Sequence, residues 1–182
     1  AGFVKKLFKN RFMVEPEIKG VYLWGGVGRG KTYLMDLFYE CIPFNQKERT
    51  HFHRFMSSVH KELKNLQGRK NPLDLIATRI ADRVKILCFD EFFVSDIGDA
   101  MLLAGLFEAL FRRGVVLVAT SNIHPDALYE TGLQRERFLP AIHLIRTCTL
   151  VVELEKGVDY RLQKLSNAML YHFPNDAKAN IE

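Results

Sequence analysis

Short apolar runs alternate along the chain with segments of helical periodicity. The runs that predict buried strands are Gly20–Trp24, Thr50–Phe52, Val84–Phe89, Val115–Thr120 and Thr149–Leu154. The segments whose apolar residues recur every three or four positions, and so predict helices, are Lys31–Cys41, Met56–Leu66, Leu73–Arg83, Asp99–Arg113 and Pro125–Thr131. Strands and helices that alternate in this way indicate an α/β domain with a parallel sheet.

The central strands are predicted to be covered on both faces. Ile86–Phe89 and Val115–Val118 are apolar at consecutive positions rather than at alternate ones, as strands of a doubly wound sheet are. The apolar stripe of segment Asp99–Arg113 packs on this sheet, and Gly114 ends that helix. We therefore expect a three-layer sandwich around a five-stranded parallel sheet, with ligands bound beyond the carboxyl ends of the strands.

A glycine-rich loop follows the first predicted strand and opens the first predicted helix. It fits the phosphate-binding pattern G-x-x-x-x-G-K-[ST], in which glycines let successive backbone N–H groups converge on phosphate oxygens. Lys31 would bind the β- and γ-phosphates, and the hydroxyl of Thr32 would bind Mg²⁺. The motif gives Arg29 no role of its own. The residues expected to bind the nucleotide are Gly25, Gly26, Val27, Gly28, Arg29, Gly30, Lys31, Thr32 and Tyr33.

Polar side chains end the next two apolar strands. Asp90 and Glu91 follow one of them, and a carboxylate at the tip of a buried strand needs a cation, which Mg²⁺ on Thr32 would supply to Asp90. Glu91 would point toward the attacking water and act as the base. Asn122 follows the other strand. If that strand lies between those carrying the loop and the acidic pair, Asn122 would reach the γ-phosphate and its water.

These motifs, GGVGRGKT, ILCFDEF and VATSN, resemble those of the AAA+ ATPases. The similarity is closer to one branch, the ZapE family of cell-division ATPases and its mitochondrial AFG-type relatives. The segments that carry this resemblance are His51–Met56, Cys88–Ile97, Gly132–Arg135, Phe138–Pro140 and Asp159–Arg161. The resemblance spans nearly the whole chain, from about Gly20 to about Leu165.

The resemblance implies a P-loop NTPase fold of AAA+ type that hydrolyses ATP with Mg²⁺ and acts on a protein partner, such as the division protein FtsZ. It also implies assembly into a homo-oligomer with ATP. Lys31, Glu91, Asn122 as first sensor, and Arg135 as an arginine finger in the neighbouring subunit's site would carry catalysis, with Arg137 as the competing finger. We expect residues 1–165 to form the ATPase core and residues 166–182 to begin a C-terminal helical lid that is largely missing.

Two other functions stay open. The net charge of +5 would suit a nucleotide-dependent nucleic-acid-binding protein of the helicase-loader kind. The basic residues are scattered, however, and the densest run, Lys5 to Arg11, is expected to be a solvated face, so we expect no stable nucleic-acid complex. The second alternative is a nucleotide switch without appreciable turnover.

Composition and the remaining motifs bear on location and metal content. There is no stretch of about 20 apolar residues and no signal peptide, and the three scattered cysteines favour a reducing compartment. We expect a cytoplasmic protein, or a mitochondrial one if the source is a eukaryote, and a fragment of a longer chain. His51, His53 and His60 are expected to pack through hydrogen bonds or to couple nucleotide to partner, because no cysteine or clustered carboxylate stands near them in sequence to complete a zinc site.

Overall fold

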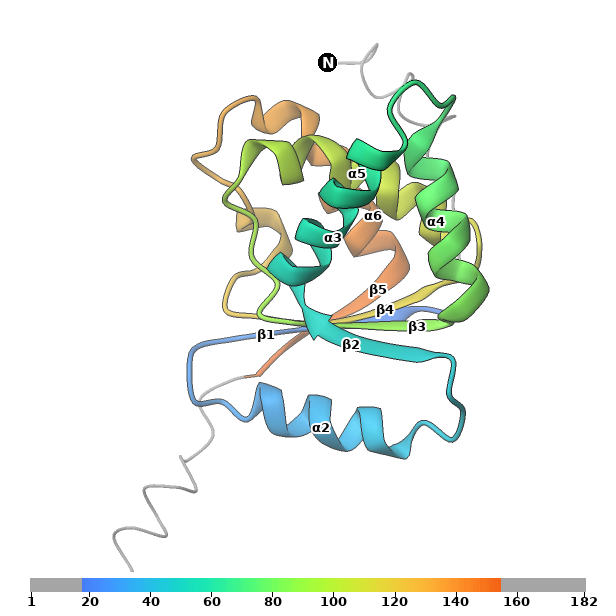
Figure 1. The fold of residues 1–182 in the computed structure, drawn as a ribbon. Coiled ribbons are helices and arrows are strands. Elements are labelled where there is room, and N and C mark those ends of the chain that lie inside the picture. The colour runs from blue at the N-terminus through green and yellow to red at the C-terminus, as the bar shows by residue number, and fades with distance from the viewer. Residues whose placement is uncertain (1–17, 155–182) are drawn as a thin grey trace, which may run out of the picture.

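The computed structural model describes residues 18–154, which form one α/β domain (Figure 1). Its strands are β1 (Gly20–Trp24), β2 (Lys47–His51), β3 (Ile86–Asp90), β4 (Val116–Ser121) and β5 (Thr149–Glu153). Its helices are α2 (Lys31–Cys41), α3 (Phe52–Asn65), α4 (Pro72–Arg83), α5 (Ile97–Phe111) and α6 (Leu139–Cys148), with two 3-10 turns, η1 (Pro125–Ala127) and η2 (Arg135–Arg137). The expected boundary at residue 165, the segment 166–182 and the Asp159–Arg161 motif lie outside the described residues.

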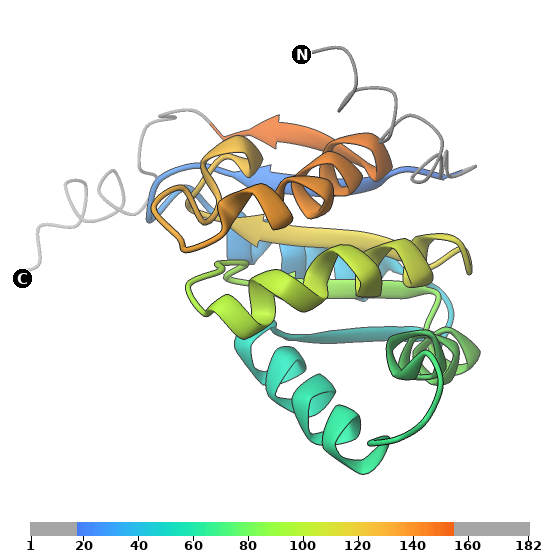
Figure 2. The same ribbon diagram turned by 90° about the horizontal axis from the view of Figure 1, so that it is seen from above.

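All five strands are parallel, in the order β2-β3-β4-β1-β5 (Figure 2). This confirms the five-stranded parallel sheet and places β4 between the strand before the glycine-rich loop and the strand before the acidic pair. The register aligns Trp24 with Ser121 and Phe89 with Ala119. The ends of β1 and β3 therefore reach the same edge of the sheet, one strand apart.

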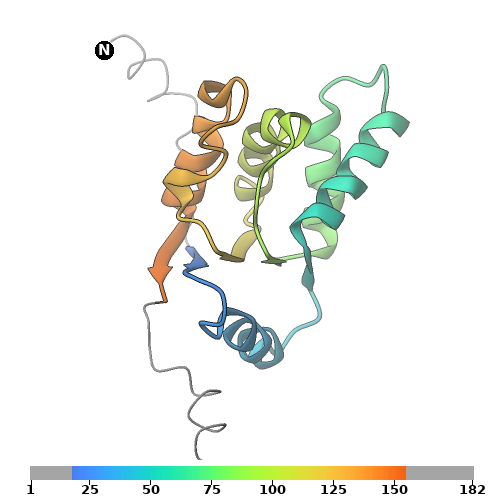
Figure 3. The ribbon, with the colours of Figure 1, turned by 90° about the vertical axis from the view of Figure 1, so that its left-hand side faces the viewer.

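The helices form two unequal layers. Among the described elements α2 alone lies on one face of the sheet, while α3, α4, α5 and α6 cover the other (Figures 1 and 3). The connection from β1 to β2 crosses the sheet in the direction opposite to the later connections, and right-handed crossovers then place its helix on the opposite face. The main core fills the space under the larger layer, and a smaller cluster of Met35, Cys88 and Val118 lies under α2.

The second predicted strand was wrong in its bounds. The chain is extended over Lys47–His51, and Phe52 already begins α3. β2 is an edge strand, and its charged side chains bind groups of neighbouring elements, so the apolar signal expected of a strand is absent there. The Phe52 ring instead packs in the core against Phe89 and Phe92, with ring centroids 5.6 and 4.5 Å away.

The predicted helix Pro125–Thr131 was also wrong. Only the 3-10 turn η1 forms, and Tyr129 has a positive φ of 54°, which no continuing α-helix allows. A helix that the sequence patterns did not predict, α6, follows at Leu139–Cys148 with Pro140 in its first turn, where proline is tolerated. None of the described helices is long and apolar enough to cross a membrane.

Candidate active site

The glycine-rich loop wraps from the end of β1 to the first turn of α2. Gly28 and Gly30 have φ values of 79° and 80°, which residues with a Cβ rarely adopt. Gly30 is the N-cap of α2 and provides no side-chain capping hydrogen bond. The first-turn N–H groups and the positive end of the helix dipole are thus directed at the loop, which is the arrangement that binds a phosphate.

Lys31 folds back over this loop. Its Nζ donates hydrogen bonds to the carbonyls of Gly25, at 2.7 Å, and Gly26, at 2.6 Å. Partial burial lowers the pKa of Lys31, and the neighbouring Arg29 guanidinium lowers it further. An anion in the loop would oppose both effects, because a nearby negative charge favours the protonated amine. Thr32, Val27 and Tyr33 are exposed beside the loop, within reach of a ligand from solvent.

Strand β4 holds the glycine-rich loop and the acidic pair side by side. The N–H of Gly25 donates to the carbonyl of Ser121 at 3.2 Å, and the N–H of Phe92 donates to the carbonyl of Thr120 at 2.7 Å. The first residue of the loop and the residue after Glu91 are therefore bound to consecutive residues of one strand.

Glu91 projects from this edge into solvent. Its backbone is in the left-handed region, with φ 54°, and its side chain is 81% exposed. Its N–H donates to the Thr120 hydroxyl at 3.3 Å, and the Ser121 hydroxyl donates to the Phe92 carbonyl at 2.7 Å. These bonds keep the strained turn in place.

Glu91 and Asn122 meet at one hollow of 560 Å³ beyond the ends of β3 and β4. Its lining is completed by residues of α3, of the segment between β3 and α5, of α5, and of the end of β4 and the segment after it: Phe52, His53, Phe92, Phe93, Ser95, Asp99, Ser121 and Ile123. The structure thus brings together the residue expected to act as base and the residue expected to act as sensor.

Asp90 is turned away from this hollow and is bound by an arginine. Arg49 of β2 donates from Nε and Nη2 to the two carboxylate oxygens of Asp90, at 2.7 and 3.1 Å, and from Nη1 to Asp36 of α2 at 2.5 Å. Hydrogen bonds to these carboxylates, first of all to Asp90, raise the pKa of Arg49 above its ordinary value. Sequence reasoning missed Arg49 because it placed the strand later in the chain. The sequence feature that could have indicated this contact is an arginine two residues before His51. His51 is the residue that pairs with Asp90 in the sheet.

The residues present fit a magnesium ion. Asp90 offers a carboxylate and Thr32 a hydroxyl, and hard cations such as Mg²⁺ prefer oxygen ligands of this kind. Asp36, which Arg49 also binds, lies one helical turn after Thr32 on α2. Asp90 and the beginning of α2 are consequently neighbours.

Arg135 is bound within its own chain. Its Nη2 donates to the carbonyl of Asp126 at 2.6 Å, and its Nε is buried without a hydrogen-bond partner. Arg137 is exposed, and within residues 18–154 its side chain makes no hydrogen bond or ion pair. Neither arginine lines the hollow that contains Glu91 and Asn122.

The histidines separate into two groups. The rings of His51 and His53 are stacked with centroids 5.7 Å apart, and His51 Nδ1 lies 4.0 Å from Glu91 Oε2. His60 Nε2 is hydrogen-bonded to Asp99 at 2.6 Å beside Asp96, so carboxylates do cluster near this histidine, contrary to the expectation from sequence spacing. Asp96 already caps the N-terminus of α5, where its carboxylate accepts a hydrogen bond from the N–H of Asp99. This supports the hydrogen-bonded packing expected for His60.

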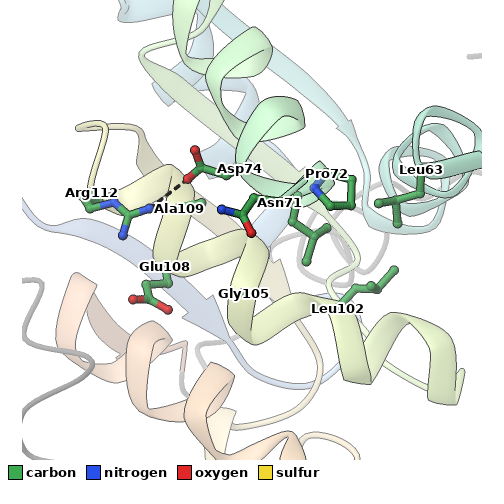
Figure 4. Close-up of a pocket in the computed structure, with 10 residues that line it drawn as sticks. Leu63, Asn71, Pro72, Asp74, Leu102, Gly105, Glu108, Ala109 and Arg112 are labelled. Atoms are coloured by element: carbon green, nitrogen blue, oxygen red, sulfur yellow. Dashed lines mark hydrogen bonds and ion pairs between the residues drawn. The ribbon is translucent and has the colours of Figure 1, made fainter. Parts of the chain in front are cut away.

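A second cavity, of 360 Å³, lies between α3, α4 and α5, away from the predicted site (Figure 4). Leu63, Leu73 and Leu102 contribute its apolar wall, and Asp74 and Arg112 form an ion pair of 2.9 Å at its rim. No residue expected to bind nucleotide lines this cavity.

Comparison with known sequences gives one clear family. The family described as AFG1-like ATPase matches residues 1–182. Cell division protein ZapE of Escherichia coli strain K12 is 60% identical over 157 residues, which cover 86% of this chain and 42% of ZapE. Lactation elevated protein 1 homolog B of Danio rerio is 42% identical over 88% of this chain and 34% of its own. The chain thus spans less than half the length of these relatives.

Comparison with solved structures supports the fold. AMPPCP-bound DnaA from Aquifex aeolicus superposes with a TM-score of 0.55 at 16% identity, over 90% of this chain and 49% of DnaA. The DnaC helicase loader superposes with a TM-score of 0.51 at 14% identity, over 84% and 86% of the two chains. Together with the sheet order and the glycine-rich loop, these similarities confirm the expected P-loop NTPase fold.

Proposed function

The chain belongs to the AFG1-like ATPase family, and from this we propose that it binds Mg-ATP at Gly25–Thr32 and hydrolyses it to ADP and phosphate with Glu91. The observation that carries the proposal is the pair of backbone hydrogen bonds by which Thr120 and Ser121 hold Phe92 and Gly25. They keep the phosphate-binding loop and the acidic pair at one edge of one sheet, which a shared triphosphate requires.

Nucleotide binding would use the loop and the first turn of α2. Lys31 already donates two hydrogen bonds to loop carbonyls, and phosphate oxygens would take these donors over. Thr32 and Asp90 would hold Mg²⁺, which supplies charge neutralisation at the β- and γ-phosphates. Val27, Arg29 and Tyr33 complete the surface offered to the nucleotide.

Hydrolysis would use the other side of the same edge. Glu91, exposed and fixed through its backbone, would accept a proton from the attacking water. Asn122 would orient that water with an uncharged amide. Arg135 would neutralise charge on the γ-phosphoryl group of a neighbouring subunit, so the active form would be a homo-oligomer assembled with ATP.

The energy of hydrolysis would be used to remodel or regulate a protein partner. The name of the E. coli relative places it in cell division, and we propose a client of that kind, FtsZ or another protein, for this chain. The corresponding compartment is the cytoplasm, or the mitochondrion if the source is a eukaryote. Ordering of the segment after Glu91 by bound nucleotide would connect nucleotide state to client affinity.

Replacing the proposed base tests the reaction. We expect Glu91→Gln in the full-length protein to lower phosphate release by about a hundredfold or more, because a positioned general base contributes at least that much. Binding of a fluorescent ATP analogue should be retained. Glu130→Gln, at an exposed position outside the hollow, is the matched control. Equal rates for wild type and Glu91→Gln would remove the mechanism, and negligible rates in both would leave a nucleotide switch.

Binding of nucleic acid is the competing function, and the described surface does not favour it. Several arginines that could contact phosphates are paired with carboxylates instead: Arg79, Arg83, Arg112, Arg113 and Arg146. We expect fluorescence anisotropy with single-stranded DNA to show no stable complex at physiological salt. Tight binding with a steep salt dependence would favour the helicase-loader alternative.

A further inference from the structure

We propose that Arg49 is a built-in counter-cation of Asp90 that makes metal binding at this carboxylate depend on nucleotide. The proposal rests on the proposed function, in which Asp90 is a ligand of Mg²⁺. It concerns what happens at Asp90 when no nucleotide is bound.

Arg49 binds Asp90 through the geometry that gives the strongest such pairs. Two parallel N–H donors meet the two oxygens of one carboxylate, at 2.7 and 3.1 Å. The side chains are 21% and 15% exposed, so water screens the pair less than it would screen a surface pair. Asp90 thus has a fixed cation before any metal arrives.

Arg49 is itself held from a second element. Its third donor reaches Asp36 on α2, the helix that begins at the phosphate-binding loop. Two carboxylates share one guanidinium, which leaves a net charge of −1 at the site. Arg49 cannot move away to admit a metal without leaving the mostly buried carboxylate of Asp90 unpaired, which is costly.

The electrostatic consequence is a site that attracts a free divalent cation less strongly than the same carboxylates would without Arg49. Such a cation approaching Asp90 would meet a carboxylate already neutralised by a guanidinium a few ångströms away. A triphosphate changes the balance, because it brings several negative charges and further oxygen ligands next to Thr32. Each carboxylate oxygen has a second lone pair, so Asp90 can accept a metal while Arg49 stays bound.

Metal binding in the absence of nucleotide tests this inference. The measurement is the electron paramagnetic resonance of Mn²⁺ titrated into the nucleotide-free full-length protein. We expect Arg49→Met to bind Mn²⁺ at least about tenfold more tightly than wild type, because the variant removes a fixed positive charge next to the metal's carboxylate ligand. The added affinity should disappear in the double variant Arg49→Met/Asp90→Asn, because the metal would then lack its carboxylate.

Two controls separate charge from shape. Arg49→Lys keeps the positive charge and should bind Mn²⁺ as weakly as wild type. Arg83→Met removes an arginine paired with Glu48 elsewhere on the surface and should have no effect. If thermal unfolding shows that Arg49→Met does not fold, Arg49→Gln, which keeps donors but no charge, takes its place with the same expectation.

Unchanged or weaker Mn²⁺ binding in a folded, charge-removing variant would overturn the proposal. So would added affinity that persists after Asp90→Asn. The metal titration needs no turnover, so it reports on Arg49 even if Glu91→Gln shows that the chain does not hydrolyse ATP.

Discussion

Arg135 donates a hydrogen bond of 2.6 Å to the backbone carbonyl of Asp126, a residue of the turn that follows Asn122. The residue expected to act in a neighbouring subunit is therefore connected, within its own chain, to the segment after the expected sensor. Its buried Nε without a partner shows that this contact leaves one donor unused.

Mixing of inactive variants tests the action of Arg135 in trans. We expect Arg135→Ala to lower phosphate release by about a thousandfold or more, as the loss of an arginine finger does. A mixture of Arg135→Ala and Glu91→Gln subunits should regain activity, because some sites then combine an intact Glu91 with an intact Arg135 from the neighbour. Arg137→Ala is the matched control. No recovery on mixing, or a larger loss from Arg137→Ala, would contradict the assignment.

Thr120 is predicted to position Glu91 through its backbone. Thr120→Val removes the hydroxyl that accepts the Glu91 N–H while keeping the shape of a residue that is 4% exposed. We expect the free energy of unfolding to fall by about 1 kcal/mol and the turnover rate by about tenfold, as judged by urea unfolding and phosphate release. Thr120→Ser, which restores the hydroxyl, should restore the turnover rate. A variant with normal turnover would show that Glu91 needs no such support.

Lys31 should govern nucleotide affinity. We expect Lys31→Met to weaken binding of an ATP analogue by about tenfold to a hundredfold, because a charge-assisted hydrogen bond to phosphate is worth about 1.5–3 kcal/mol. Isothermal titration calorimetry measures the change. Lys85→Met, at an exposed position before β3, removes the same charge and should leave affinity unchanged. Equal losses in both variants would indicate a general charge effect.

Burial of Cys88 predicts a loss of stability at alkaline pH. Burial raises the pKa of this thiol from its ordinary value of 9.0 to about 12. Above the ordinary value the unfolded chain releases the proton while the folded chain keeps it, so the free energy of unfolding should fall as pH rises through this window. Urea unfolding across the window should show a shallower decline for Cys88→Ala than for wild type.

The exposed Cys41 provides the control for this prediction. Cys41→Ala should leave the pH dependence of unfolding unchanged, because folding leaves Cys41 exposed. An unaltered decline in Cys88→Ala would mean that other buried groups, such as Tyr22, whose pKa burial also raises, cause the effect.

The sequence was sufficient to predict the sheet wherever a strand is buried on both faces. The apolar runs at β3 and β4 identify the strands before the acidic pair and before Asn122, and the glycine-rich loop marks the end of β1. The bounds of β2 were not predicted, because its sequence is Lys47-Glu48-Arg49-Thr50-His51. It is an edge strand that is stabilised through its polar side chains. A pattern of hydrophobicity cannot detect a strand of that kind.

The same limit explains what was missed in the site. Arg49 could be found only through strand pairing, since Arg49 and Asp90 are 41 residues apart in sequence. α6 was not predicted either, and the signal for it was Pro140, because proline is typical of the first turn of a helix. Local motifs, by contrast, were sufficient to predict that Lys31, Glu91 and Asn122 lie at one edge of the sheet.

Strand β4 carries one further consequence. Main-chain hydrogen bonds to the carbonyls of Thr120 and Ser121 set the distance between the glycine-rich loop and the acidic pair. Two strands that have one strand between them lie roughly 10 Å apart. A substitution elsewhere on the surface would therefore leave the distance between the glycine-rich loop and Glu91 unchanged, as long as these main-chain bonds are kept.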